Sequence, residues 1–203
     1  MKIYEITGYD ITDYENHPLY HKAKEIFKPS LKDKKLELQL KNWKRIMEIY
    51  GFQHLGTGSY GSAYIRPDYP WVFKIFRDDP AYLSFITYAK DNQSNPNLPK
   101  IGGDFIPINN DTYVVKLEKL SEITDKEFKD IKRQIDVMVD SIFDAVDEQD
   151  MNNHQLNAIK MYPGIYQFLQ YWYHNMPQSE LDIKPGNIMK RGDIPVLLDP
   201  IVQ

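Results

Sequence analysis

Three glycines followed directly by a strand constrain this chain more than any other feature. The stretch L-G-T-G-S-Y-G-S-A-Y, residues 55–64, places Gly56, Gly58 and Gly61 at the G-x-G-x-x-G spacing. That spacing alone is weak, because it also suits a dinucleotide-binding turn or a flexible loop. A dinucleotide-binding fold needs a helix at the last glycine, whereas this chain continues as an apolar strand into a turn at 66–69. The stretch therefore predicts a hairpin of strands lying over phosphate groups.

A lysine stands inside the next predicted strand. The sequence W-V-F-K-I-F, residues 71–76, flanks Lys74 with large apolar side chains on both sides, as is typical of a strand. An unpaired ammonium group buried there would be costly. Lys74 is therefore either an edge lysine that reaches solvent or the partner of an anion. We favour the second interpretation, with the phosphates of a bound nucleotide as the anion.

A second polar loop, D-I-K-P-G-N, begins at Asp182, and Asp199 follows a short way beyond it. Phosphoryl transfer needs a group that orients the attacking hydroxyl, a cation that meets the developing charge, and oxygens that hold magnesium. Asp182, Lys184 and Asn187 with Asp199 match these needs at the expected spacing. The apolar run 195–198 predicts a buried strand that delivers Asp199. Taken alone, the pattern is also typical of a surface turn before an edge strand.

Composition limits the class of protein. The chain has 203 residues, 42% of them hydrophobic and 13% aromatic, which is enough for one domain or two small lobes. Its net charge of −4, with basic residues spread along the chain, argues against nucleic-acid binding. It has no cysteine, which excludes disulfides and thiolate metal sites. Early charges argue against a signal peptide, and no apolar run reaches membrane-spanning length; we expect a cytoplasmic protein.

The N-terminal residues 1–33 carry no clear period, and we interpret them as an appendage on the main body. His17 and His21 are four residues apart, as in some zinc sites on helices. Pro18 stands between them and no glutamate follows His17, so a metal site is not expected.

An amphipathic helix is predicted from Asp33 to Tyr50. Its apolar positions recur every three or four residues, while lysines and glutamates fill the other face. Gly51 fits a C-terminal cap for this helix. The apolar positions are Leu36, Leu40, Trp43, Met47 and Tyr50.

The middle of the chain predicts more strands and two helices. Strands at 104–108 and 112–120 would complete the first sheet and lead at Glu118 into a hinge. A helix is expected from Thr124 to about Asp150, with Glu127 completing a capping box. Its acidic residues most simply form a solvated face, and a metal site or a site for a basic partner is the alternative. They are Asp140, Asp144, Asp147 and Glu148.

A second helix, about 164–175, is densely aromatic, and we interpret its aromatic stripe as core. Base stacking on these rings would require exposure. The rings are Tyr166, Phe168, Tyr171, Trp172 and Tyr173.

Residues 52–203 resemble the protein-kinase-like fold in three places: the glycine stretch, the V-F-K that ends at Lys74, and D-I-K-P-G-N with Asp199. More narrowly, L-G-T-G-S-Y-G-S-A-Y, G-N-I-M and G-D-I-P-V-L-L-D-P-I are similar to the early serine/threonine kinases of lytic podophages. By this resemblance Lys74 would bind the α- and β-phosphates, Asp182 would be the catalytic base, and Lys184 would neutralise the transferred phosphate. It also implies nucleotide contacts from Gly56, Gly58, Ser59, Gly61 and Glu118, and magnesium ligands at Asn187 and Asp199.

The same resemblance implies an α+β, bilobal fold with an antiparallel-sheet N-lobe and a reduced, mostly helical C-lobe. The expected parts are an N-terminal helical extension at 1–50, the N-lobe at 51–120 and the C-lobe at 121–203. ATP and Mg²⁺ would be the cofactors. The substrates would be host proteins, with RNA polymerase or a ribonuclease as possible targets, and no direct nucleic-acid binding is expected.

The sequence departs from the family pattern in several places. No glutamate lies between Lys74 and Glu118, so the usual ion-pair partner of the strand lysine is missing. The usual H-R-D reads E-L-D up to Asp182, and D-F-G reads D-P-I from Asp199. We expect no activation segment, because the given sequence ends at Gln203. Two alternatives therefore stay open: a catalytically weak or inactive kinase-fold module that binds and inhibits a host protein, and a small-molecule phosphotransferase.

Overall fold

The computed structural model describes residues 44–45, 47–107, 112–144 and 151–202. These residues form two compact units. The first comprises the described residues of Met1–Asp79 together with Ile101–Lys119, and the second those of Pro80–Lys100 and Leu120–Gln203. The first is mainly an antiparallel sheet and the second is mostly helical. The α+β class expected from the sequence is thus confirmed, and the two units are consistent with a small protein-kinase-like fold.

Some expectations lie outside the described residues. They are the His17 and His21 pair and the predicted helix up to residue 43. The division into 1–50, 51–120 and 121–203 also stays a prediction. The structure places Pro80–Lys100 with the second unit, although this segment interrupts the first unit in sequence.

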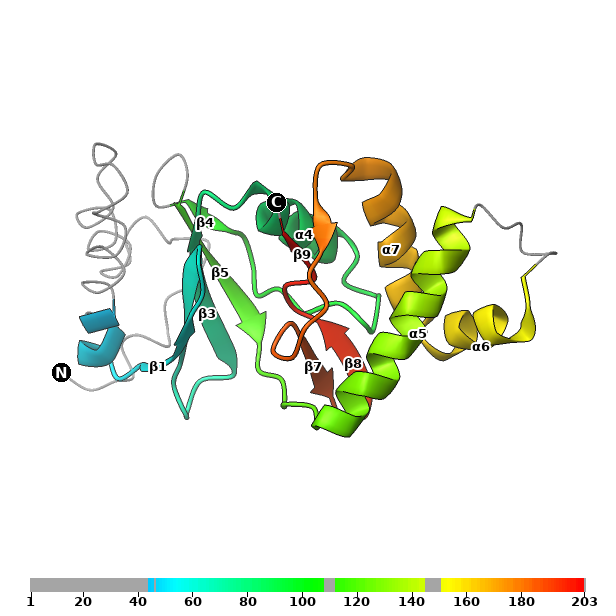
Figure 1. Cartoon of the computed structure of the whole chain (residues 1–203). Coiled ribbons are helices and arrows are strands. Elements are labelled where there is room, and N and C mark those ends of the chain that lie inside the picture. The colour runs from blue at the N-terminus through cyan, green and yellow to red at the C-terminus, as the bar shows by residue number, and fades with distance from the viewer. Residues whose placement is uncertain (1–43, 46, 108–111, 145–150, 203) are drawn as a thin grey trace. The chain divides into compact units, whose positions relative to one another are not determined.

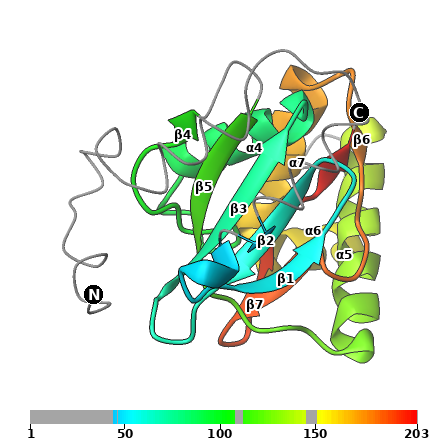
Figure 2. The same ribbon diagram turned by 90° about the vertical axis from the view of Figure 1, so that its left-hand side faces the viewer.

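The sheet of the first unit has five strands in the order β1-β2-β3-β5-β4 (Figure 2), and every neighbouring pair is antiparallel. The predicted strand pair around the glycines and the lysine strand are both present, and the strand predicted at 104–108 is reduced to two residues. The strands are β1 (Gln53–Thr57), β2 (Gly61–Ile65), β3 (Trp71–Arg77), β4 (Ile106–Pro107) and β5 (Thr112–Glu118).

One face of this sheet carries the core of the first unit. Since side chains alternate along a strand, the register of β2, β3 and β5 puts Tyr64, Ile75 and Val114 on the same face. Each of these side chains is at most 5% exposed. Met47 and Phe52 complete the cluster, so the chain that enters β1 covers this face.

The cap predicted at Gly51 is confirmed. Residues 44–45 and 47–49 are helical, and Gly51 has a φ of 79°, a left-handed conformation that glycine adopts without strain. The Gly51 amide donates to Glu48 O at 3.0 Å, and the Phe52 amide donates to Met47 O at 2.9 Å. This pair of bonds is the Schellman motif, and it turns Phe52 toward Met47 in the core.

The second unit contains four labelled helices: α4 (Pro80–Asp91), α5 (Asp125–Phe143), α6 (Asn153–Met161) and α7 (Pro163–Asn175). Figure 1 shows α6 and α7 beside α5. The predicted capping box at Thr124 is present, with Glu127 N donating to Thr124 Oγ1 at 3.2 Å and Thr124 N donating to Glu127 Oε2 at 2.6 Å. None of the helices among the described residues is long and apolar enough to span a membrane.

Two features of these helices differ from the sequence expectation. Helix α5 ends at Phe143 with Asp144 as its C-cap, earlier than predicted; residues 145–150 lie outside the described part. Helix α6 was not predicted, because its nine residues bury little: only Ala158 is fully buried. Its start is nevertheless encoded locally, since Asn152 and Gln155 form a capping box.

Aromatic side chains of α4 and α7 form much of the second core. Phe85 packs edge-on against Phe168 with ring centroids 5.3 Å apart, and Tyr88 stacks on Tyr171 at 4.1 Å. Phe168 and Trp172 are buried, which confirms the aromatic helix as core. Tyr173 is the exception, with 38% of its surface exposed.

Two small two-stranded sheets complete the second unit. One pairs β7 (Ile188–Arg191) with β8 (Ile194–Leu197), and the other pairs β6 (Glu180–Leu181) with β9 (Ile201–Val202). The strand predicted to deliver Asp199 is therefore β8, which ends two residues before it.

Buried asparagines tie α4 to these strands. Asn95 Nδ2 donates to Gly164 O at the start of α7, and Asn97 Nδ2 donates to Pro195 O in β8. The Leu197 amide donates back to Asn97 O at 2.9 Å. Because buried amides are costly unless they are bonded, this network fixes the segment after α4 to α7 and β8 within the second unit.

Candidate functional site

The loop D-I-K-P-G-N forms a compact turn after β6. Asn187 is 8% exposed, and its Nδ2 donates to the backbone O of Asp182 at 2.8 Å and to Asp182 Oδ2 at 3.0 Å. Lys184 Nζ lies 2.5 Å from the same Oδ2. The Asn187 amide closes the turn on Lys184 O at 3.1 Å. The structure therefore shows that Asp182, Lys184 and Asn187 contact one another, whereas the sequence showed only their spacing.

The backbone of this loop depends on Gly186. Its φ of 91° lies in the left-handed region, where a side chain would be strained, although no heavy atom lies within 4 Å of an added Cβ. Pro185 precedes it and keeps the segment out of a helix. Side chains of Asp182 and Lys184 remain 27% and 60% exposed, so both can meet a ligand.

Backbone hydrogen bonds place Asp199 beside this loop. The amide of Leu198 donates to Asn187 O, and the amide of Asp182 donates to Pro200 O, both at 2.8 Å. Asp199 lies between these two bonded residues, so its backbone is fixed next to both Asp182 and Asn187. These three residues belong to one unit, and their proximity follows from local pairing.

Oxygen donors at this loop suit magnesium. Asn187 uses Nδ2 to bind Asp182, which leaves Oδ1 as an acceptor, and Asp199 supplies a carboxylate. Magnesium in phosphotransferases is typically held by one or two such protein oxygens together with substrate phosphates. No group of three or more His, Asp or Glu side chains that could hold a metal occurs among the residues described. Two protein oxygens, one each from Asn187 and Asp199, match the protein's share of a magnesium ion held jointly with phosphates.

The other candidate residues lie on the sheet of the first unit. Lys74 is paired in register with Ala63 on β2 and Val115 on β5. The alternation of side chains puts Val72 and Leu117, which pair with each other, on the same face as Lys74. Lys74 thus stands on a face of small and branched apolar side chains, opposite the face that carries the Met47 and Phe52 core.

A second lysine of the sheet, Lys116, has different surroundings. Lys116 pairs with Phe73 on the opposite face of the sheet and is 3% exposed. Its Nζ lies 5.8 Å from the centroid of the Trp71 ring, and burial lowers its pKa below the ordinary lysine value. Lys74, by contrast, is only half-buried.

The three loop glycines have different structural roles. A Cβ at Gly61 would lie 2.2 Å from Ile75 O, so β2 approaches β3 too closely for any side chain there. At Gly56 and Gly58 an added Cβ would have no neighbour within 4 Å, and neither has a left-handed φ. Packing within the protein explains Gly61 but neither of the other two.

The β1–β2 turn is held by hydrogen bonds around Ser59. The Gly58 amide donates to Gly61 O, and the Arg77 amide donates to Tyr60 O, both at 2.8 Å. Thr57 Oγ1 lies 2.8 Å from Ser62 Oγ across the turn. The turn is therefore fixed at its base, while Ser59 at its tip is exposed.

Glu118 and its surroundings link the sheet to α5 in sequence. Glu118 is the last residue of β5 and pairs with Trp71. Shortly after it, Ser121 pairs with Lys190 of β7, and Lys190 Nζ donates to Glu127 Oε1 at 2.8 Å. The hydrogen bonds from Lys190 and Thr124 lower the pKa of Glu127 to about 2.

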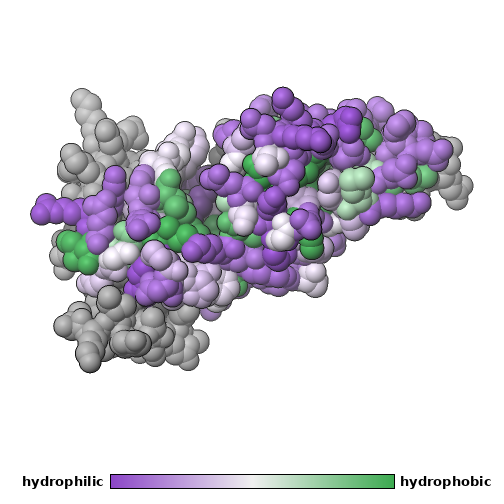
Figure 3. Space-filling view, turned by 90° about the horizontal axis from the view of Figure 1, so that it is seen from below, coloured by the Kyte–Doolittle hydropathy of each residue, from purple (hydrophilic) through white to green (hydrophobic). Residues whose placement is uncertain are grey.

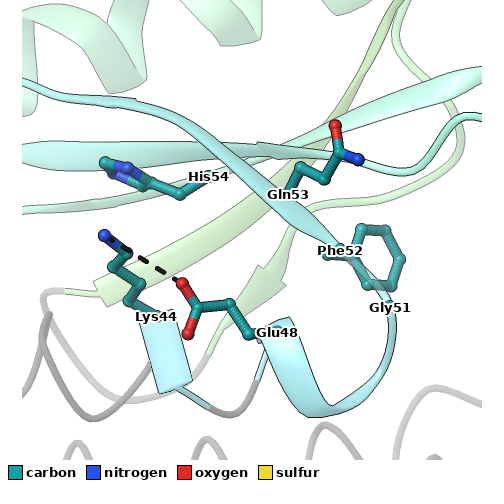
Figure 4. A pocket seen from close by; sticks show the side chains of 6 residues that line it. All are labelled: Lys44, Glu48, Gly51, Phe52, Gln53 and His54. Carbon is teal, nitrogen blue, oxygen red and sulfur yellow. Dashed lines mark ion pairs between the residues drawn. The ribbon is translucent and has the colours of Figure 1, made fainter.

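An open cavity of about 460 Å³ lies elsewhere on the first unit (Figure 4). In the figure, Lys44 and Glu48 point toward one another, and their charged atoms are 4.0 Å apart. None of the predicted site residues lines it. Its lining residues are Lys44, Glu48, Gly51, Phe52, Gln53 and His54.

Sequence reasoning missed the apolar residues that surround Lys74. Val72 and Leu117 are unremarkable in the sequence, and only the pairing of β3 with β5 places them beside the lysine. Alternation within β3 could have suggested Val72, since it lies two residues before Lys74. No local signal identifies Leu117, which comes from a distant strand.

The chain matches no protein-family model, and no curated protein matches it. Among solved structures, the ternary complex of streptomycin, ATP and APH(2")-IIa is similar to it, with a TM-score of 0.31 and 12% sequence identity. That likeness covers 86% of this chain and 75% of the other. At this level the likeness gives no information about activity.

Proposed function

We propose that this protein is a phosphotransferase that uses ATP and Mg²⁺. The observation that carries the proposal is the hydrogen-bonded loop in which Asn187 and Lys184 both hold Asp182, with Asp199 fixed alongside by the bonds of Leu198 and Pro200. A surface turn would not need a buried side-chain amide, that of Asn187, to donate two hydrogen bonds to the same aspartate. Orienting a carboxylate in this way is what proton transfer from a hydroxyl requires.

The contacts of Asp182 suggest how the reaction proceeds. Lys184 Nζ and Asn187 Nδ2 both contact Oδ2, which leaves Oδ1 to accept the proton of the substrate hydroxyl. The hydroxyl oxygen forms a bond to the γ-phosphorus as the bond from that phosphorus to the β-phosphate oxygen breaks, and ADP leaves. Lys184 meets negative charge on the transferred group. Magnesium, held by Asn187 Oδ1 and Asp199, would neutralise phosphate charge.

Binding of the nucleotide is assigned to the sheet. The apolar face around Lys74 suits an adenine ring and its ribose, and Lys74 supplies a cation for the phosphates. Gly56 and Gly58 leave open space where a phosphate chain can approach the backbone. The Glu118 backbone, at the end of β5, would meet the adenine edge.

We further propose that the acceptor is serine or threonine in a protein. The resemblance of the glycine stretch and of the segments around Asn187 and Asp199 to early podophage kinases supports this finer assignment. It also supports a phage origin and host targets in transcription or RNA processing. These finer parts can fail while the phosphotransferase proposal stands.

Transfer of label from γ-labelled ATP tests the proposal directly. The purified chain is incubated with Mg²⁺ and a bacterial lysate, beside Asp182→Asn and Asp199→Ala. Acid-stable label in protein that both variants lose would support a serine/threonine kinase. Label in a small molecule instead would overturn the protein acceptor and keep phosphoryl transfer.

Nucleotide binding is measured separately by thermal shift. ATP with Mg²⁺ should raise the melting temperature of the chain, since a ligand that binds only the folded state stabilises it. Lys74→Ala should abolish the rise, while Lys129→Ala, an exposed lysine on α5, should keep it. A rise that survives Lys74→Ala would contradict the assignment of Lys74. A chain that binds ATP but transfers no label would favour the inactive binding module.

A further inference from the structure

Two aromatic side chains are exposed side by side at the C-terminal ends of α5 and α7. Phe143 is 57% exposed and Tyr173 is 38% exposed, and their ring centroids lie 5.2 Å apart in an edge-on arrangement. The ring of Phe143 also lies edge-on to that of Trp172, with centroids 6.2 Å apart. Figure 3 shows one face of the molecule, on which hydrophobic residues form separate groups among hydrophilic ones. A contacting pair of exposed rings is a feature that a binding partner can bury.

The same end of α5 carries unbalanced negative charge. Asp140 lies in the last turn and Asp144 is the C-cap, and the last turn contains no basic residue. One turn earlier, Asp136 is paired with Lys132 at 2.7 Å. In the part of the chain that the structure describes, neither Asp140 nor Asp144 forms an ion pair. Carboxylates at the negative end of a helix dipole are destabilising, so both would gain from a cation.

We propose that Phe143, Tyr173, Asp140 and Asp144 form a docking surface for a basic segment of a partner protein. The segment carries an apolar side chain between lysines or arginines. The apolar side chain would bury the exposed rings, and the cations would meet the two carboxylates and the aromatic faces. An acidic partner or nucleic acid would be repelled by the same carboxylates.

This surface is independent of the proposed phosphoryl transfer. It lies on the ends of two helices, and none of its residues belongs to the loop at Asp182 or to the sheet around Lys74. If the acceptor is a protein, the surface would hold it through a second contact. Binding can therefore be measured without turnover, and each proposal can fail without the other.

Fluorescence anisotropy with a labelled lysine–leucine peptide tests the docking surface. We expect the full chain to bind this peptide and to lose affinity as salt is raised. A glutamate–leucine peptide of equal length should not bind, and a lysine–serine peptide should bind much more weakly. Binding of the glutamate–leucine peptide, or no binding of the lysine–leucine peptide, would overturn the proposal.

Matched variants locate the binding. Phe143→Ser should lower the affinity for the lysine–leucine peptide about tenfold. Met161 is also 57% exposed but lies on α6, so Met161→Ser should leave the affinity unchanged. The double change Asp140→Asn with Asp144→Asn should weaken binding about fivefold. Asp193→Asn, in the exposed turn before β8, is the control for charge. Equal losses in the control variants would refute this location.

The melting temperature distinguishes a binding role of Asp140 and Asp144 from a structural one. Removing the two carboxylates from the helix C-terminus should leave the melting temperature unchanged or raise it, although peptide binding falls. A lower melting temperature would show that the aspartates stabilise the fold, against the proposal. Self-association that disappears in Phe143→Ser would instead identify a second copy of the chain as the occupant and overturn the basic partner.

Discussion

The same substitution, glycine to alanine, should have opposite effects at positions only a few residues apart in the β1–β2 turn. At Gly61 a Cβ would lie 2.2 Å from Ile75 O and 3.0 Å from Phe76 Cα. The backbone of β2 must therefore shift away from β3, which strains the packing and weakens the hydrogen bonds between the two strands. We expect a loss of about 3 kcal/mol in the free energy of unfolding. For a chain of this size, that lowers the melting temperature by about 6–12 °C.

Alanine at Gly56 or Gly58 should not destabilise the fold as it does at Gly61. An added Cβ meets no atom within 4 Å at either position, and alanine reduces the entropy of the unfolded chain. The melting temperature should therefore stay within about 2 °C of the original or rise. If these glycines admit phosphates to the backbone, the rise in melting temperature caused by ATP and Mg²⁺ should shrink in both variants.

A single thermal-shift series with and without ATP decides both points. If Gly61→Ala has the same melting temperature as the parent chain, the close approach of β2 to β3 is refuted. A full ATP response in Gly56→Ala and Gly58→Ala would refute the role of this turn in covering phosphates. Ser59→Ala serves as a control for a side-chain change at the tip of the turn, and it should leave the melting temperature unchanged.

Two further predictions concern the second unit. Asn187→Ala removes two hydrogen bonds to Asp182 and should lower the free energy of unfolding by about 2 kcal/mol; urea denaturation measures it, and an unchanged midpoint would contradict the loop geometry. The pKa of Glu127 is lowered from 4.5 to about 2 by hydrogen bonds from Lys190 and Thr124, so its contribution to stability is complete above pH 4.5 and disappears as the pH falls through 2. Glu127→Gln should flatten the dependence of stability on pH across that window, and an unchanged slope would be evidence against the ion pair.

Local sequence signals predicted much of the fold. The strands around the glycines and Lys74, the caps at Gly51 and Thr124, and the aromatic helix that ends at Asn175 were all expected, and the structure confirms them. These features depend on residues close in sequence: an alternating pattern, a capping pair, a glycine with a left-handed φ. Helix α6 was missed because it is short and buries little, and the early end of α5 was missed because its apolar pattern continues past Phe143.

The sequence by itself determined which chemical groups are present and where the chain turns. The spacing of Asp182, Lys184 and Asn187, with Gly186 between the last two, dictates a short loop with a carboxylate, a cation and an amide. Such information is local, because turn geometry and backbone conformation depend on neighbouring residues.

Only the tertiary structure decided which groups meet. The Asn187 amide bonds to Asp182, and the backbone of Leu198 and Pro200 fixes Asp199 beside them. The pairing of β3 with β5 places Leu117 on the face that carries Lys74. The packing of α7 beside α5 leaves Tyr173 exposed next to Phe143, where periodicity alone predicted a buried ring. Contacts between distant segments depend on register and packing, which a pattern along one segment does not encode.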